Sequence, residues 1–260
     1  IGFMVNSILP ARLGEFVRAY VIGKKEQISP VCSFATIVAE RVFDSVALVV
    51  LLLVVLFHVG ANPSGGAFIA FLRSMVPVFI GVAGGMFCGI YLLHHYTEPT
   101  VRVVHRATFW VPAPLRERVN RLLRSFTSGL QVVRMGGPML HVLLWSAFLW
   151  IFMALSNFFI LCSFGLSVPF FASYTLLVLQ ALSTLIPFLP GYTGSFHFAT
   201  VFGLGLYGVP SDEALGAALV IHAVNMLPFI VLGLVFMWRD NLSLREIQRV
   251  PVREVSASSP

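Results

Sequence analysis

Three charged residues inside an apolar stretch constrain the fold of this chain more than any other feature. Residues 33–57 are apolar apart from a few hydroxyl groups and the side chains of Glu40, Arg41 and Asp44. This stretch is long enough to cross a bilayer, which takes about 20 apolar residues in a helix. An ionised group at the bilayer centre costs at least about 2.5 kcal/mol, so it persists where it faces protein or water and has partners. The stretch therefore predicts a membrane helix whose charged face is covered.

The rest of the chain is also typical of a helical membrane protein. Its 260 residues are 58% hydrophobic and 11% charged, with a mean hydropathy of +0.90. Its apolar runs are continuous over about twenty residues, whereas the strands of membrane barrels alternate over about ten. The sequence predicts an all-α, polytopic helical membrane protein. Spans are expected at residues 31–58, 67–95, 139–164, 168–187 and 212–238.

Charged residues near the N-terminus follow helical spacing on two neighbouring segments. One face contains Ser33, Thr36, Glu40 and Asp44, flanked by Arg41, and the other contains Arg12, Glu15 and Arg18. Between these faces we expect a short polar loop at residues 24–27 and a helix that starts at Pro30. One interpretation of the two faces is a buried structural ion network. The other is that the arginines also bind an anion, because the guanidinium group matches the geometry of a phosphate. The two interpretations are compatible.

Two segments carry proline and glycine where a continuous membrane helix cannot form. The first interruption contains Pro10 and Gly14, and the second contains Pro190, Gly191 and Gly194. Irregular backbone at membrane depth is tolerated only where protein or a cavity satisfies its polar groups. We therefore expect both segments to be broken or re-entrant and to line the site.

The two broken segments are also related in sequence. Sliding the chain on itself by 180 residues aligns residues 9–30 with 189–210, with eight identities in twenty-two positions. The identical pairs are Leu9/Leu189, Pro10/Pro190, Gly14/Gly194, Phe16/Phe196, Ala19/Ala199, Val21/Val201, Gly23/Gly203 and Pro30/Pro210. Flanking Lys and Arg residues give the spans that follow opposite orientations, which predicts an inverted repeat with units of about 6–58 and 183–238. The site would lie between them, with one charged wall and one apolar wall.

Basic residues mark one side of the membrane. They cluster before the first span, within residues 97–138 and after the last span, which predicts that these segments are cytoplasmic. Within this loop, apolar residues follow a 3.6-residue period and predict an amphipathic helix over about 113–135, lying on the membrane surface. Residues 1–238 are expected to form a single transmembrane domain, followed by a cytoplasmic tail, 239–260. Because the chain opens mid-pattern without Met, we expect it to be N-terminally incomplete.

No pattern in the sequence favours enzymatic or metal chemistry. His94 and His95 lie at the end of a span, where amphipathic side chains are common. His197 and His222 are expected to be isolated residues with a packing or pore-lining role. Neither a nucleophile–His–acid set nor a metal-ligand spacing is visible. We therefore expect no catalytic residue, no metal, no cofactor and no nucleic-acid partner.

Two motifs carry a resemblance to a known family. The first is N-S-I-L-P-A-R-L-G-E-F-V-R-A-Y followed by A-T-I-V-A-E-R-V-F-D, and the second is P-F-L-P-G-Y-T-G-S-F-H. With them the chain resembles, over essentially its whole length, the transmembrane domain of the lysylphosphatidylglycerol synthase/flippase family. This is the membrane part of the multiple peptide resistance factors, and it also occurs in stand-alone flippase-like proteins. Tyr192 stands where a second glycine is common in that family.

The resemblance implies a lipid flippase or transporter in the cell (inner) membrane that moves a phospholipid or an aminoacylated or glycosylated lipid between leaflets. The residues expected to meet the lipid headgroup are Arg12, Glu15, Arg18, Glu40, Arg41 and Asp44. Expected partners are anionic or aminoacylated membrane lipids, with a second copy or a lipid-modifying enzyme as further candidates. The alternatives are a transporter of a small organic anion, a membrane scaffold for a lipid-modifying enzyme such as a glycosyltransferase, and an intramembrane lipid-modifying enzyme.

Overall fold

A computed structural model describes residues 1–9, 13–59, 66–96, 98–100, 102, 113–130, 137–184 and 190–240. These residues are mainly helical and contain no strand. The elements are α1 (Gly2–Ile8), α2 (Gly14–Glu26), α3 (Pro30–Val59), α4 (Gly66–His95), α6 (Ala113–Leu130), α7 (Gly137–Ser163), α8 (Phe171–Ser183), the 3₁₀ turn η3 (Pro190–Tyr192), α9 (Ser195–Gly205) and α10 (Ser211–Arg239). The predicted class, an all-α polytopic membrane protein, is confirmed.

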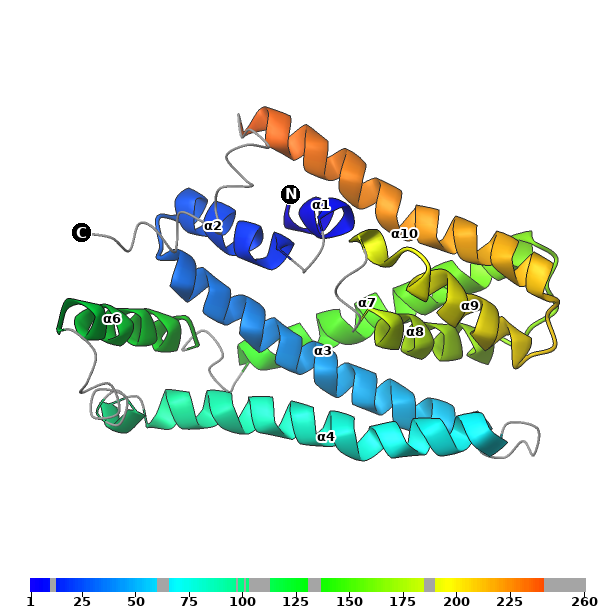
Figure 1. Cartoon of the computed structure of the whole chain (residues 1–260), viewed down its shortest axis with the longest axis horizontal. Helices are drawn as coiled ribbons and strands as arrows, with labels where there is room; N and C mark the ends of the chain where they lie inside the picture. The colour runs from blue at the N-terminus through cyan, green and yellow to red at the C-terminus, as the bar shows by residue number, and fades with distance from the viewer. Residues whose placement is uncertain are drawn as a thin grey trace.

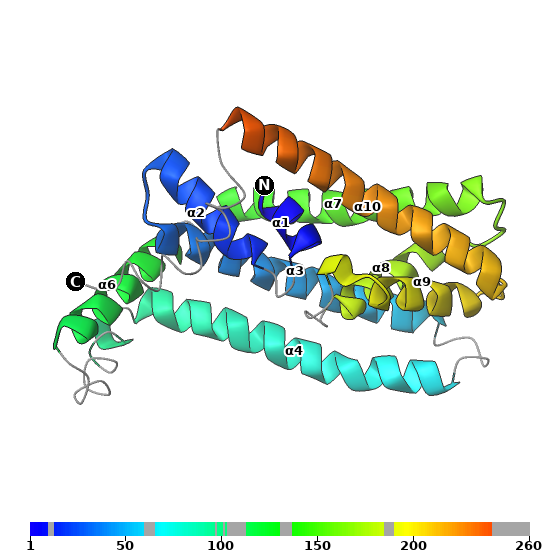
Figure 2. The same ribbon diagram turned by 45° about the horizontal axis from the view of Figure 1, so that its top comes forward.

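Four of the described helices, α3, α4, α7 and α10, are long and apolar enough to cross a membrane. They extend along the long axis of the molecule (Figure 1, Figure 2). The first of them begins at Pro30, as predicted, because proline has the φ angle of a first helical turn and needs no acceptor there. Large apolar side chains point outward from these helices, with 90% of Phe57 and 83% of Trp238 exposed. Such surfaces suit contact with lipid.

The helices α1 and α2 form a hairpin near the N-terminus. They approach closely at Gly2 and Gly14, where a Cβ atom on Gly14 would collide with the Gly2 carbonyl oxygen. The break falls where Pro10 and Gly14 predicted it, although residues 10–12 lie outside the described part of the chain. The polar loop predicted at residues 24–27 is wrong, because α2 continues through Glu26 and ends at Gln27, whose φ is 55°. Lysines are good helix formers and favour the carboxyl end of a helix dipole.

A second hairpin consists of α8 and α9. Figure 1 shows α2 running from the middle of the molecule to one end, whereas α9 runs from the middle to the opposite end. The predicted full span at residues 168–187 is wrong, because α8 has 13 residues, or about 20 Å at 1.5 Å per residue. Most of its side chains are buried. Apolar composition alone did not distinguish this protein-covered half-length helix from a lipid-facing span.

Each hairpin packs against a long helix of the other half of the chain. Gly233 of α10 leaves room for Met4 of α1, since any Cβ atom there would overlap the Met4 side chain. On the other side, Leu52 of α3 and Val178 of α8 belong to one buried apolar cluster. The two tips also meet, because α1 contacts η3 and the Ser7 carbonyl oxygen lies 3.1 Å from a Cβ built on Gly191. The two broken segments therefore meet inside the molecule.

The order of elements repeats at the predicted offset. Gly14 opens α2 and Gly194 precedes the first residue of α9, while Pro30 opens α3 and Pro210 precedes α10. The long helices that follow, α3 and α10, run in opposite directions (Figure 1). This arrangement agrees with an inverted repeat, and the equivalence of the two units in three dimensions stays a prediction.

An amphipathic helix occupies Ala113–Leu130 of the predicted range, and residues 131–135 lie outside the described part of the chain. Its apolar face packs against protein. Leu130 is buried with Ala35 and Ala39 of α3, and Gly129 touches the Cys32 carbonyl group. Helical periodicity predicts the apolar face but does not distinguish a protein neighbour from lipid. The helix lies toward the end of the molecule where α2 and α10 also end (Figure 1). All three helices carry basic residues there, among them Lys24, Lys25, Arg124 and Arg239.

Candidate functional site

Charged side chains of α2 and α3 form one ion network where these helices meet. Arg18 donates to Glu40, with 2.7 Å between Nη2 and Oε2 and 3.0 Å between Nη1 and Oε1. Arg41 Nη2 lies 2.8 Å from the same Glu40 Oε1, and Arg41 Nη1 lies 3.1 Å from Asp44 Oδ2. Arg41 Nε also lies 3.9 Å from Glu15 Oε1. The two predicted charged faces are thus paired with each other through their described members.

The network is neither fully buried nor fully satisfied. Its side chains are between 23% and 39% exposed, so their charges keep some hydration. Among the described residues it contains two arginines and three carboxylates. Arg41 Nε is a buried donor with no hydrogen-bond partner there. The described network thus leaves one guanidinium donor without a hydrogen bond.

Two local contacts hold the first hairpin in place beside this network. Asn6 Oδ1 accepts a hydrogen bond of 2.7 Å from the Gly14 backbone nitrogen, so a side chain of α1 satisfies one free donor at the start of α2. The Arg18 guanidinium lies over the Phe3 ring, 5.6 Å from its centroid. Sequence analysis did not single out Asn6, because its partner is eight residues away and belongs to the next helix.

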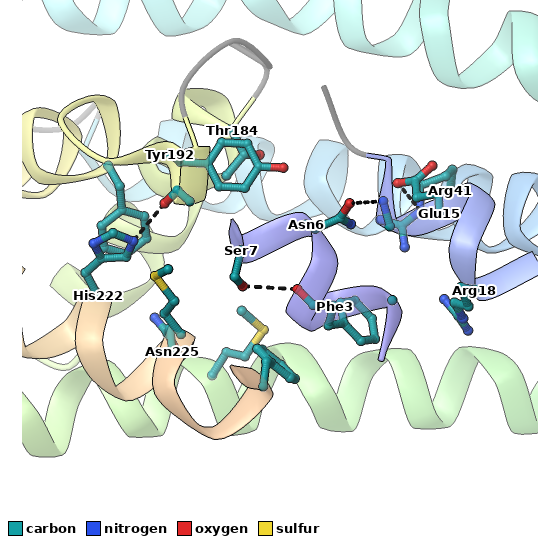
Figure 3. A pocket seen from close by; sticks show the side chains of 17 residues that line it. Phe3, Asn6, Ser7, Glu15, Arg18, Arg41, Thr184, Tyr192, His222 and Asn225 are labelled. Carbon is teal, nitrogen blue, oxygen red and sulfur yellow. Dashed lines mark hydrogen bonds and ion pairs between the residues drawn. The ribbon is translucent and has the colours of Figure 1, made fainter. Parts of the chain in front are cut away.

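A cavity of about 360 Å³ opens between the two broken segments. Figure 3 shows Glu15, Arg18 and Arg41 at one end of it and His222 and Tyr192 at the other, with α1 between them. The lining residues are Gly2, Phe3, Asn6, Ser7, Gly14, Glu15, Arg18, Arg41, Met153, Thr184, Gly191, Tyr192, Phe196, His222, Asn225, Met226 and Phe229. The cavity is large enough for a small polar headgroup and lies where an inverted-repeat protein is expected to hold its substrate.

The predicted site residues divide into three groups. Glu15, Arg18, Arg41, Gly14 and Gly191 line the cavity. Glu40 and Asp44 do not line it but hold the arginines that do. Gly194 lies outside the lining with a φ of 91°, Pro190 opens η3, and Pro10 and Arg12 lie outside the described residues.

The wall opposite the arginines is more polar than predicted. His222 Nδ1 lies 3.0 Å from His197 Nε2, and His222 Nε2 lies 2.8 Å from the Gly191 carbonyl oxygen. The prediction that these two histidines are isolated is therefore wrong, because α9 and α10 bring together residues 25 positions apart. Phe196 stacks on His222, with 4.9 Å between ring centroids. Within the described residues, no group of three or more His, Cys, Asp or Glu side chains could hold a metal ion.

A buried polar chain fixes the second hairpin to α7. Asn157 Nδ2 donates to Gln180 Oε1, and Gln180 Nε2 donates to Thr200 Oγ1, both at 3.2 Å. All three side chains are buried, so breaking one bond would leave an unsatisfied polar group. This chain connects α7, α8 and α9 and supports the wall that carries the histidines.

Comparisons with known proteins decide the family. Residues 1–233 match the family described as the lysylphosphatidylglycerol synthase transmembrane region. The chain belongs to this family. The resemblance carried by its two sequence motifs is therefore confirmed, and this family member places two of its motif arginines beside an interior cavity. No solved structure matches the chain.

Relatives occur in archaea. The chain is 22% identical to a UPF0104 membrane protein of Methanocaldococcus jannaschii, over 90% of this chain and 93% of that protein. It is 24% identical to a UPF0104 membrane protein of Methanothermobacter thermautotrophicus, over 86% of this chain and 69% of that protein. It is also 28% identical to the glycosyltransferase AglD of Haloferax volcanii, over 92% of this chain but only 42% of that protein. These matches support a multi-pass membrane protein with a lipid-related role.

Proposed function

We propose that this protein is a lipid flippase or transporter that receives the phosphate-bearing headgroup of a membrane lipid in the cavity between its two hairpins. The observation that carries the proposal is the position of Arg18 and Arg41, which line the cavity while carboxylates hold them from behind. A guanidinium held in this way is already oriented toward an oxyanion, so less ordering is required when a phosphate arrives. Family membership supports a lipid as the source of that phosphate.

Glu15 supports a headgroup that carries an ammonium group beside its phosphate, as in an aminoacylated or zwitterionic lipid. Glu15 lines the cavity and offers a carboxylate acceptor for such a group. Among the described residues its arginine contact is a long one, 3.9 Å to Arg41 Nε.

The arrangement of helices supports transport. Each hairpin reaches only the middle of the molecule, and the cavity lies where their tips meet. Rocking one part of the molecule against the other around this cavity would open it to each side of the membrane in turn, as in transporters built from inverted repeats. The apolar outer surfaces of α7 and α10 would provide a path for the acyl chains of the lipid, since many of their large apolar side chains are exposed.

The test is lipid translocation in vesicles that contain the purified protein. Fluorescent phosphatidylglycerol, phosphatidylethanolamine and lysylphosphatidylglycerol are placed in the inner leaflet, and their appearance in the outer leaflet is followed by chemical quenching. We expect translocation by the native chain and at least a tenfold loss in Arg41→Gln. Arg124→Gln serves as the matched control, because Arg124 forms an exposed pair with Glu98 far from the cavity. Equal rates in protein-free vesicles and in vesicles with the native protein would contradict the proposal.

The same vesicles distinguish the rival functions. Uptake of a small organic anion without lipid movement would favour a solute transporter. A chemical change in the recovered lipid would favour an intramembrane enzyme. No transport, combined with recovery of a lipid-modifying enzyme after cross-linking in native membranes, would favour a scaffold.

A further inference from the structure

A second polar group of side chains lies at the cavity, and the lipid proposal does not use it. His222 of α10 lines the cavity and is hydrogen-bonded both to His197 of α9, which does not line it, and to the carbonyl of Gly191. This carbonyl belongs to the 3₁₀ turn η3, which interrupts the second broken segment and in which the φ angle of Gly191 is 57°. The pair therefore connects the long helix α10 to both parts of the second broken segment.

The carbonyl fixes the protonation of the pair. A carbonyl oxygen only accepts, so His222 Nε2 must carry a hydrogen and donate it to Gly191. In a neutral His222 ring, Nδ1 is then an acceptor, and His197 Nε2 must donate to it across 3.0 Å. This leaves His197 Nδ1 without a hydrogen, and the described residues supply no bond to it. The neutral pair thus has one basic nitrogen available.

The pair can take up one proton without losing either hydrogen bond. A proton on His197 Nδ1 leaves both existing bonds unchanged. If His222 carries the added charge instead, His222 Nδ1 donates to His197 Nε2, so the hydrogen bond between the two rings is kept with donor and acceptor exchanged. A second proton would place two donors opposite each other across 3.0 Å and would break the bond.

The groups around the two histidines determine whether an added proton forms a local ion pair or changes the charge of the cavity. Phe196 stacks on His222, and Tyr192 of η3 is the titratable group on the same wall. The charged groups of the cavity, Glu15, Arg18 and Arg41, lie at its other end, with α1 between them and His222 (Figure 3).

The helices around the pair contribute few other titratable groups. The segment of α1 has none in its side chains, and the segment of α8 has only Tyr174. In α10, Asp212, Glu213 and Arg239 lie in its end turns, and in α7, His141 and Cys162 lie toward its ends. No carboxylate contacts either histidine among the described residues. A proton on the pair would therefore add positive charge to the cavity rather than complete a local ion pair.

We propose that the His197–His222 pair binds a single proton, and that this proton and a phosphate-bearing headgroup bind to the cavity cooperatively. The second part rests on the proposed function. Protonation places positive charge at the end of the cavity away from the arginines, so the positive charge that attracts an anion into the cavity increases. By linkage, the anion favours the proton by the same factor as the proton favours the anion, typically about 5–150-fold.

The proton site is tested by nitrogen-15 NMR of histidine-labelled full chain in lipid nanodiscs. We expect the His222 signal of a ring protonated at Nε2, and one shared titration step that takes up a single proton across both rings. His222→Asn and His197→Gln should each abolish the shared step, and either variant alone suffices if the other does not fold. His95→Gln is the control, because His95 stacks on Tyr91 away from the cavity. Independent titration of the two rings would overturn the proposal.

The coupling is tested by binding of two probes at several pH values. Dihexanoyl phosphatidylglycerol represents a lipid headgroup and dimethyl phosphate a free anion, and both keep one negative charge throughout. We expect the affinity for the lipid probe to fall about 5–150-fold as pH rises through the shared step, and to become independent of pH in His222→Asn. Pronounced pH dependence for dimethyl phosphate alone would support coupling to a free anion and would contradict the lipid. Binding that ignores pH would overturn the coupling but leave the lipid proposal intact. Absence of binding by both probes would overturn the proposed function and the coupling, while the NMR result would still decide the proton site.

Discussion

Among the described residues, Arg18 and Glu40 form the closest ion pair between the two halves of the N-terminal unit. Their side chains meet at 2.7 Å across the contact between α2 and α3, and Glu40 also accepts from Arg41. One carboxylate thus holds both described arginines that line the cavity. Because these side chains keep partial hydration, rearranging the network would cost less free energy than in a fully buried one.

Replacing Glu40 with Gln should destabilise the protein and loosen both arginines. We expect a loss of about 1–2 kcal/mol, below the ~3–5 kcal/mol typical of a fully buried pair, since about a third of each side chain is exposed. Thermal unfolding in nanodiscs measures the change. Glu98→Gln is the control, because its pair with Arg124 is 3.7 Å long and mostly exposed, and its loss should cost under about 0.5 kcal/mol. Equal effects of the two substitutions would contradict the structural role of Glu40.

Replacing Gly14 with Ala should disrupt the first hairpin. A Cβ atom at this position collides with the Gly2 carbonyl oxygen and comes within 2.6 Å of Asn6 Oδ1, so α1 and α2 would have to separate. We expect a loss of at least about 1–3 kcal/mol, together with reduced lipid translocation. Gly84→Ala is the matched control, because nothing lies within 4 Å of its Cβ position and alanine favours a helix. Monodispersity after extraction and the unfolding temperature compare the two variants.

Replacing Asn6 with Ala should weaken the start of α2. The substitution removes the only side-chain acceptor that the described structure provides for the Gly14 amide, at an expected cost of about 0.5–2 kcal/mol. Asn6→Asp keeps the acceptor and should retain most of the stability. Hydrogen exchange at the amides of residues 14–17 provides the measurement. Unchanged exchange in Asn6→Ala would show that another group satisfies the Gly14 amide.

Replacing Ser128 with Cys should allow a disulfide between α6 and α3. Ser128 Oγ lies 3.9 Å from Cys32 Sγ, and neither position is deeply buried. We expect rapid oxidation to a bridge that is absent when Cys32 is replaced by Ser in the same variant. Mass spectrometry after thiol labelling counts the remaining free cysteines. Failure to form the bridge under mild oxidation would contradict the packing of α6 on α3.

The sequence predicted the charged network better than the wall that faces it. Charges in an apolar run are conspicuous, and their spacing of three or four residues assigns them to helical faces, so an ion network between the two faces was expected. Which residues pair, such as Arg18 with Glu40, did not follow from the spacing. His197 and His222 come from different helices, and no local spacing connects them. The length of α8 was missed for a similar reason. A buried half-length helix and a full span are equally apolar, and only tertiary neighbours distinguish them.

The contact of Met4 with Gly233 determines which parts of the molecule can move as units. The two repeat units are continuous in sequence, but the first hairpin is fastened to the last helix, and α8 is fastened to α3. A hinge motion that separated the two units would break both the α1–α10 contact and the α3–α8 contact. Motion that keeps them would carry α1 together with α10 and α8 together with α3. The rigid bodies of a transport cycle would then be composites that each combine a helix from the first half of the sequence with one from the second.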